Sequence, residues 1–150
     1  AGSFGSQYGK ALVTGRAGNI VDGRPDLRQF VFVDVKTQRL RAFSYGALVN
    51  TFLVSTGLPK YPTPIGDFTV TDKPYKVRYQ WSYGPGNPDN YDLGNVTWNL
   101  RFAPHIYIHY APWHNAFGHR RSHGCVNVNK ENAQWIYGWA DVGTPVRIAG

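Results

Sequence analysis

The sequence contains very little cysteine and no long apolar run. Its one cysteine in 150 residues, Cys125, excludes an intrachain disulfide and therefore a small disulfide-stapled fold. No stretch approaches the roughly 20 apolar residues of a membrane span. The first ten residues, AGSFGSQYGK, lack the apolar segment of a signal peptide. A chain of this length can bury a core of its own, so we expect one domain.

Acidic residues are also scarce. Nine Asp and Glu stand against 16 Lys and Arg, for a net charge of +7. This charge favours an acidic partner such as nucleic acid, anionic lipid or an anionic cell-wall polymer. The basic residues are scattered, however, with Arg120-Arg121 the only adjacent pair, and no nucleic-acid-binding motif is visible. We therefore expect no specific nucleic-acid binding.

The composition favours a β-rich domain, with 17 Gly, 10 Pro and 15% aromatic residues. Residues 1–28 are Gly-rich and polar, and we interpret them as an N-terminal arm or edge strand that precedes a domain at residues 29–150. Apolar alternation predicts strands, the first three forming a meander, at 29–35, 40–44, 48–55, 68–71, 105–110 and 145–149. Residues 129–140 predict the one clear helix, with Asn129 as a possible N-cap and Ala133, Ile136, Tyr137 and Ala140 facing the core.

The sequence also predicts how exposed two further segments are, residues 73–99 and residues 105–110. Residues 73–99 are polar, aromatic and rich in Gly and Asn, which indicates a poor core and a good surface. They fit either a substrate lid or a hairpin excursion with ordinary surface aromatics. In residues 105–110, His105, Tyr107 and His109 share one face, and we expect one face of this strand to be buried and the other to line something polar.

The chemistry of the sequence is concentrated in residues 105–125, which hold all five histidines and Cys125. A thiol that reacts at neutral pH needs a base, and imidazole is the side chain best suited to that task. His123 is two residues before Cys125, so in an extended segment the two side chains are roughly 7 Å apart. His109 can lie on a neighbouring strand and is the better candidate to face the sulfur, with His123 holding the turn or assisting.

Gly124 permits a sharp turn that can aim backbone amides at an oxyanion beside the thiol. Two other interpretations remain open. Cys125 can be an inert core residue, as lone cysteines usually are. The histidines and the cysteine can supply zinc ligands, although CxxC and HExxH spacings are absent.

These residues resemble the L,D-transpeptidase catalytic domain, the YkuD family. The family motif is a His, a gap, and then Ser/Thr-His-Gly-Cys followed by an apolar residue and Asn or Arg. Here it reads His109, then SHGCVN from Ser122 to Asn127. The segments VDVKTQRLRAFSYGALVNTFLVSTG, TPIGDFTV, IHYAPW and NAQWIYGWADVGTPVRI are also similar to the family, so the resemblance covers about residues 29–149.

The resemblance implies a mainly β fold, a YkuD-like β-sandwich of mixed sheets with one short helix near the C-terminus. It also implies a peptidoglycan L,D-transpeptidase, a transferase whose Cys125 thiolate attacks the third-residue carbonyl of a tetrapeptide stem. D-Alanine then leaves, and an amine acceptor resolves the acyl-enzyme. His109 would accept and return the proton, and the backbone carbonyl of Tyr110 would orient its ring. Relatives often have Ser or Gly where this chain has Tyr110.

Further roles follow from the same resemblance. His123 joins the catalytic group, and the backbone amides of His123, Gly124 and Cys125 would form the oxyanion hole, with Ser122 beside them. Asn127 and Trp113 would bind substrate. No metal and no other cofactor is expected.

The implied partners are peptidoglycan stem peptides, with carbapenems as inhibitors. The implied location is extracytoplasmic, in the periplasm or cell wall. Two alternatives keep the same fold: an L,D-carboxypeptidase that uses water as acceptor, a hydrolase, and a catalytically idle cell-wall-binding module.

Overall fold

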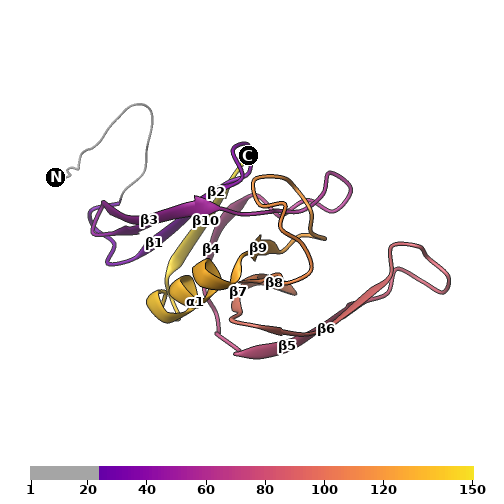
Figure 1. Ribbon diagram of the computed structural model, residues 1–150. Coiled ribbons are helices and arrows are strands. Elements are labelled where there is room, and N and C mark those ends of the chain that lie inside the picture. The colour runs from indigo at the N-terminus through magenta and orange to yellow at the C-terminus, as the bar shows by residue number, and fades with distance from the viewer. Residues whose placement is uncertain (1–23) are drawn as a thin grey trace.

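The computed structural model describes residues 24–150, and in this part of the chain two β-sheets pack face to face around the core (Figure 1). The larger sheet has the strand order β3-β2-β1-β10-β4, and the smaller has the order β7-β8-β9. A separate hairpin pairs β5 with β6. The strands are β1 (Phe30–Asp34), β2 (Arg39–Ser44), β3 (Ala47–Leu53), β4 (Gly66–Thr69), β5 (Lys76–Trp81), β6 (Tyr91–Thr97), β7 (Leu100–Ala103), β8 (Ile106–Tyr110), β9 (Val126–Val128) and β10 (Pro145–Ala149).

The core lies between the two sheets and the helix α1 (Lys130–Trp139), which packs against β8. Val31 and Val33 of β1 point into it because they are two residues apart on one face of the strand. Ile108 of β8 and Ile136 of α1 meet the same core, and both are fully buried. The predicted β-sandwich of mixed sheets with one short helix is therefore confirmed.

The first three strands form the predicted antiparallel meander. The last strand, β10, then runs parallel to β1 and lies between β1 and β4. The helix begins where its N-cap predicts, since the Asn129 side chain accepts a hydrogen bond from the Asn132 amide at 2.9 Å. Ala133 and Ala140 are fully buried on its inner face, whereas Tyr137 is only partly buried.

Three further sequence expectations concern residues 105–110, residues 73–99 and the N-terminal arm. Both faces of β8 are buried, since Tyr107 and His109 on one face are nearly as buried as Ile108 on the other, and His109 lines a cavity with polar residues such as Ser122 and Asn127. The β5–β6 hairpin covers that face with the buried Tyr79 and Val96, while most of residues 73–99 are exposed or partly buried, as the expectation of a poor core and a good surface requires. The predicted N-terminal arm falls outside the described residues up to position 23, and residues 24–28 form no strand.

Within the described part of the chain, the single helix has ten residues and is not long and apolar enough to cross a membrane.

Candidate active site

Two neighbouring strands bring the motif residues together. β8 and β9 run parallel, with His109 opposite Asn127 in the register. Cys125 comes directly before β9, and the loop that connects the strands carries Trp113 and the Ser122–Cys125 turn. The side chains of His109, Cys125 and Asn127 therefore line one cavity of about 160 Å³ between this sheet and the β5–β6 hairpin.

His109 is held in one orientation and one tautomer. Its side chain is only 2% exposed, and its Nδ1 lies 2.7 Å from the carbonyl oxygen of Tyr110. A carbonyl can only accept a hydrogen bond, so Nδ1 carries the proton and Nε2 keeps its lone pair. Burial lowers the pKa of His109 to about 4, so the ring is neutral at pH 7. Such a ring can accept a proton at Nε2.

Cys125 is partly buried and packs against the small cluster of Tyr79, Val96 and Tyr107. Its Sγ lies 3.7 Å from the carbonyl oxygen of His105. Burial raises the pKa of the thiol to about 11, because a thiolate would lose its hydration there. In the free protein both partners of the pair are therefore neutral at pH 7.

The turn that carries Cys125 is stabilised by hydrogen bonds within the turn and by one from a neighbouring loop. Ser122 Oγ donates to the carbonyl of Cys125 and accepts from the Gly124 amide at 3.1 Å. Thr63 Oγ1, from the 56–66 loop, donates to the Gly124 carbonyl at 2.7 Å. Gly124 has a φ of +127°, which a residue with a Cβ rarely adopts. Of the three amides that the family resemblance assigns to an oxyanion hole, that of Gly124 thus already has an acceptor.

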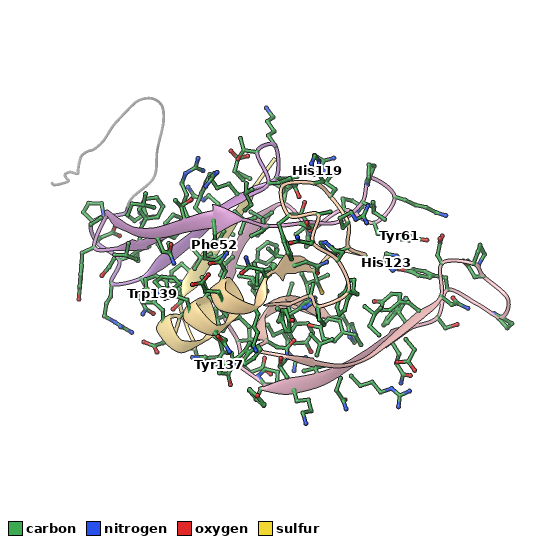
Figure 2. All side chains as sticks on the ribbon, in the orientation of Figure 1. Phe52, Tyr61, His119, His123, Tyr137 and Trp139 are labelled. Atoms are coloured by element: carbon green, nitrogen blue, oxygen red, sulfur yellow. The ribbon has the colours of Figure 1, made fainter. Side chains whose placement is uncertain are left out.

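His123 lies among tyrosines at the mouth of the cavity. Its ring centroid is 4.8 Å from that of Tyr61, 4.6 Å from that of Tyr91 and 6.0 Å from that of Tyr83. Tyr83 and Tyr91 come from the hairpin, whereas Tyr61 comes from the 56–66 loop, and Figure 2 shows Tyr61 and His123 close together opposite the hairpin tip. His123 therefore contacts both the hairpin and the 56–66 loop, and burial lowers its pKa.

Asn127 and Trp113 form another part of the cavity wall. Asn127 is 1% exposed, and its backbone is fixed by a pair of hydrogen bonds with Ser55, at 2.8 and 2.9 Å. Trp113 is 40% exposed, and its ring centroid lies 5.7 Å from that of His109. The Tyr110 side chain packs against Trp98, so the residue in this position contributes its backbone carbonyl to the site and not its ring.

Sequence reasoning missed Tyr79 as a residue of this site. Tyr79 is buried on β5, its ring centroid lies 4.5 Å from that of His109, and its hydroxyl donates to Asn99 Oδ1 at 2.9 Å. The Tyr79 side chain also opposes, in part, the rise in the pKa of the Cys125 thiol. The aromatic content of residues 73–99 fits a lid or a hairpin excursion, but it does not reveal which aromatic side chains face inward, because the strand β8 that they cover comes later in the chain.

The zinc interpretation finds no ligand set in residues 24–150, where no group of three or more His, Cys, Asp or Glu side chains converges. Two of the histidines that could supply nitrogen ligands instead make hydrogen bonds within the protein. His109 faces Tyr110, and His114 contacts the Ala116 amide and Asn127.

The fold and the site together define a class of protein: a mixed-sheet β-sandwich in which a thiol and a neutral imidazole share a cavity beneath a β-hairpin. The sequence matches the L,D-transpeptidase catalytic domain, YkuD, over residues 28–148. The chain belongs to this family.

Comparison with individual relatives agrees with the family. The chain is 39% identical over 100 residues to the probable L,D-transpeptidase 3 of Mycobacterium tuberculosis, a match that covers 63% of this chain and 36% of that protein. An L,D-transpeptidase structure from Mycobacterium smegmatis superposes with a TM-score of 0.77 at 29% identity, covering 82% of this chain and 59% of that one. The structure of the L,D-transpeptidase LdtMt1 in complex with imipenem also superposes with a TM-score of 0.77. The two chains are 27% identical, and the match covers 81% of this chain and 59% of that one.

The chain spans less than half the length of the curated relatives that it matches, between 29% and 44%. The matched part is the catalytic domain.

Proposed function

We propose that this domain is a cysteine-dependent peptidoglycan L,D-transpeptidase, with Cys125 as nucleophile and His109 as general acid and base. The observation that carries the proposal is the shared cavity of these two side chains, with His109 fixed so that Nε2 is the unprotonated nitrogen. Membership of the YkuD family supports the same reaction and the same substrate class.

In the first half of the reaction the Cys125 sulfur attacks the carbonyl carbon of the third stem residue. His109 Nε2 takes the thiol proton as the bond forms, and it returns that proton to the amine of the departing D-alanine. The product is a thioester on Cys125. In the second half an acceptor amine attacks the thioester, loses its proton to His109 and leaves with the acyl group, while the sulfur recovers the proton.

The neutral state of both partners shapes this scheme. A thiol with a raised pKa is a weak nucleophile until its proton is removed, and a buried imidazole of low pKa is a weak base. Proton transfer is therefore expected to accompany attack. Developing negative charge on the substrate oxygen needs donors, and the amides of His123 and Cys125 in the turn are our candidates, because the Gly124 amide already bonds to Ser122.

Substrate contacts are assigned to the walls of the same cavity. We propose that Asn127 donates to or accepts from the stem peptide and that Trp113 covers it from the exposed side. His123 acts with Tyr61 and Tyr91 to seat the hairpin over the bound peptide. Such a substrate requires an extracytoplasmic location, in the periplasm or cell wall.

The test is intact-mass spectrometry of the protein after incubation with a disaccharide tetrapeptide and an amine acceptor, and separately with imipenem. We expect loss of D-alanine with a crosslinked product, and a covalent imipenem adduct, neither of which Cys125→Ala forms. His109→Gln should lower the rate of adduct formation by at least about 100-fold, the usual effect of a lost general base. His119→Gln is the matched control, since His119 is exposed in the same connecting loop and does not line the cavity.

The alternatives give different products. A tripeptide without crosslinked product would identify an L,D-carboxypeptidase. No turnover and no adduct in the unmodified protein would contradict the enzyme and favour a cell-wall-binding module.

A further inference from the structure

The carboxamide of Asn127 is held by a histidine to which neither the sequence motif nor the reaction scheme assigns a role. Nδ2 of the Asn127 carboxamide is assigned to the position 3.1 Å from Nε2 of His114. Oδ1, in the other position, is buried and no protein group donates a hydrogen bond to it. Nitrogen and oxygen of a carboxamide have nearly the same shape, so the hydrogen-bond partners decide which of them faces the ring.

The tautomer of His114 settles this choice. Its Nδ1 accepts a hydrogen bond from the Ala116 amide at 3.0 Å, so Nδ1 carries no proton. Burial, with a smaller contribution from the Arg121 charge, lowers the pKa of His114, so the ring is neutral at pH 7 and its single proton is on Nε2. A protonated Nε2 must donate, and only the carboxamide oxygen can accept. The oxygen of Asn127 therefore faces His114.

The amino group of Asn127 consequently takes the other, buried position, where no protein group donates a hydrogen bond. A buried N–H group needs an acceptor, which an oxygen of a ligand can provide. Asn127 lines the cavity that also holds Cys125 and His109. The donors are thus available within the cavity where the stem peptide is proposed to react.

The charge of the cavity indicates which kind of ligand group would accept hydrogen bonds from Asn127. Arg121 lines the cavity from the residue before Ser122, and no Asp or Glu is among the described lining residues. The N–H donors of a neutral carboxamide and a guanidinium on the wall of the same cavity favour an anionic oxygen over a neutral one.

We propose that His114 is a positioning residue that turns the Asn127 amino group into the cavity, where Asn127 and Arg121 bind a carboxylate of the stem peptide. This inference rests on the proposed function for the identity of the peptide. The orientation of the carboxamide rests on the hydrogen bonds alone.

The orientation is tested without any activity. Long-range ¹H–¹⁵N NMR spectra at pH 7 should show His114 with its proton on Nε2 and His109 with its proton on Nδ1, so each ring serves as the reference for the other. In Cys125→Ala protein, which cannot form the thioester, addition of the tetrapeptide should shift the Asn127 side-chain amide resonances. A proton on Nδ1 of His114, or amide resonances that do not move at saturating peptide, would overturn the proposal.

The positioning role is tested by the separation of KM from kcat. His114→Phe keeps a ring against Phe117 but removes both ring nitrogens, and it should raise the KM for the tetrapeptide at least fivefold while kcat stays within twofold. His114→Gln retains one donor and one acceptor and should return KM to within threefold of the original. If both variants have equal KM values, whether raised or unchanged, His114 has no orienting role.

The carboxylate is identified with two substrates, one amidated at the third-residue side chain and one amidated at the terminal D-alanine. Amidation of the carboxylate that this subsite binds should raise KM about tenfold in the unmodified protein and by less than twofold in Arg121→Gln. Equal KM values for all three peptides would overturn the carboxylate assignment. Formation of an imipenem adduct in the same preparation separates that result from failure of the proposed function, which would abolish the adduct as well.

Discussion

Cys125 and His109 both carry the uncharged form of their side chains at pH 7, and burial is the cause in each case. Burial disfavours a thiolate and an imidazolium alike, so it raises the pKa of Cys125 to about 11 and lowers that of His109 to about 4. The hydrogen bond from His109 Nδ1 to Tyr110 opposes this effect only in part. The resting pair therefore differs from a preformed thiolate–imidazolium ion pair.

This state predicts the pH dependence of Cys125 alkylation. A thiol whose pKa is about 11 is protonated throughout the neutral range, so the thiolate fraction rises about tenfold per pH unit up to pH 10. The rate of iodoacetamide modification in the folded protein should rise accordingly, without a plateau below pH 10. The urea-unfolded protein is the control, and its rate should level off near the ordinary thiol pKa of about 8.5. A plateau near pH 7 in the folded protein would mean that an ion pair exists before substrate binds.

The 56–66 loop supports the catalytic turn at the scale of elements, and Gly57 is its tightest point. The Gly57 amide donates to Thr63 Oγ1 at 2.9 Å, and Thr63 in turn holds the Gly124 carbonyl. A Cβ at position 57 would lie 2.0 Å from the Tyr61 carbonyl oxygen and 2.8 Å from the Thr63 nitrogen. Both contacts are with backbone, which cannot rotate away.

Gly57→Ala should consequently lower the free energy of unfolding by about 3 kcal/mol, at the upper end of the usual cost of overpacking. Urea unfolding followed by tryptophan fluorescence measures the loss. Gly138→Ala is the control, because Gly138 is an exposed helical residue and nothing lies within 4 Å of its added Cβ. That change should raise the stability by about 1 kcal/mol. Equal effects of the two substitutions would refute the tight packing of Gly57.

The β5–β6 hairpin is tied across the cavity mouth at its tip. Asp89 pairs with Lys60 at 2.6 Å and accepts from the Tyr61 hydroxyl, while Tyr61 and Tyr83 stack with their ring centroids 4.9 Å apart. Lys60 and Tyr61 hold the pKa of Asp89 below its ordinary value. Lys60 is largely exposed, so the ion pair contributes little to global stability.

Asp89→Asn should therefore loosen the hairpin tip and raise the KM for the tetrapeptide about threefold, with the midpoint of urea unfolding nearly unchanged. Steady-state kinetics at low and high salt measure the effect, which should shrink as salt screens the pair. Asp92→Asn is the matched control, since Asp92 pairs with Arg78 within the hairpin and not across the cavity. The same rise in KM for both variants would show that the change in net charge, and not the loss of the Asp89–Lys60 contact, causes the effect.

At the scale of the whole molecule, the β1–β2 turn is connected to the catalytic turn through Gln38. The buried Gln38 side chain donates to Thr56 Oγ1 at 2.7 Å and accepts from the Thr56 amide at 2.8 Å. The Thr56 carbonyl then accepts from the amides of Arg121 and Ser122. The turn between two inner strands of the larger sheet thus contributes to the position of Cys125.

Gln38→Gly is the informative substitution at this position. Gln38 has a φ of +54°, which glycine adopts without strain, so the change favours the backbone while it removes the side-chain hydrogen bonds. We expect a net loss of about 2 kcal/mol in the free energy of unfolding, together with slower imipenem acylation. Chemical unfolding and intact-mass kinetics measure the two effects. A variant as stable as the original would mean that these bonds contribute nothing beyond the strain that they offset.

The sequence by itself determined most of the local structure. Period-2 alternation predicted the strands of the meander, β4, β8 and β10, and the helix followed from Asn129 and the spacing of Ala133 and Ile136. The adjacent positions of Ser122, His123, Gly124 and Cys125 could be recognised as a motif without any coordinates. These features depend on residues close together in the chain, so the pattern of side chains carries them.

Only the tertiary structure decided how distant segments meet. The insertion of β10 between β1 and β4, the inward position of Tyr79, the link from Gln38 to Thr56 and the contact of His114 with Asn127 join residues that no local pattern relates. The burial that sets the pKa values of Cys125 and His109 has the same origin. Desolvation and hydrogen bonding depend on what surrounds a side chain in space, and that becomes defined only when both sheets and the hairpin have packed.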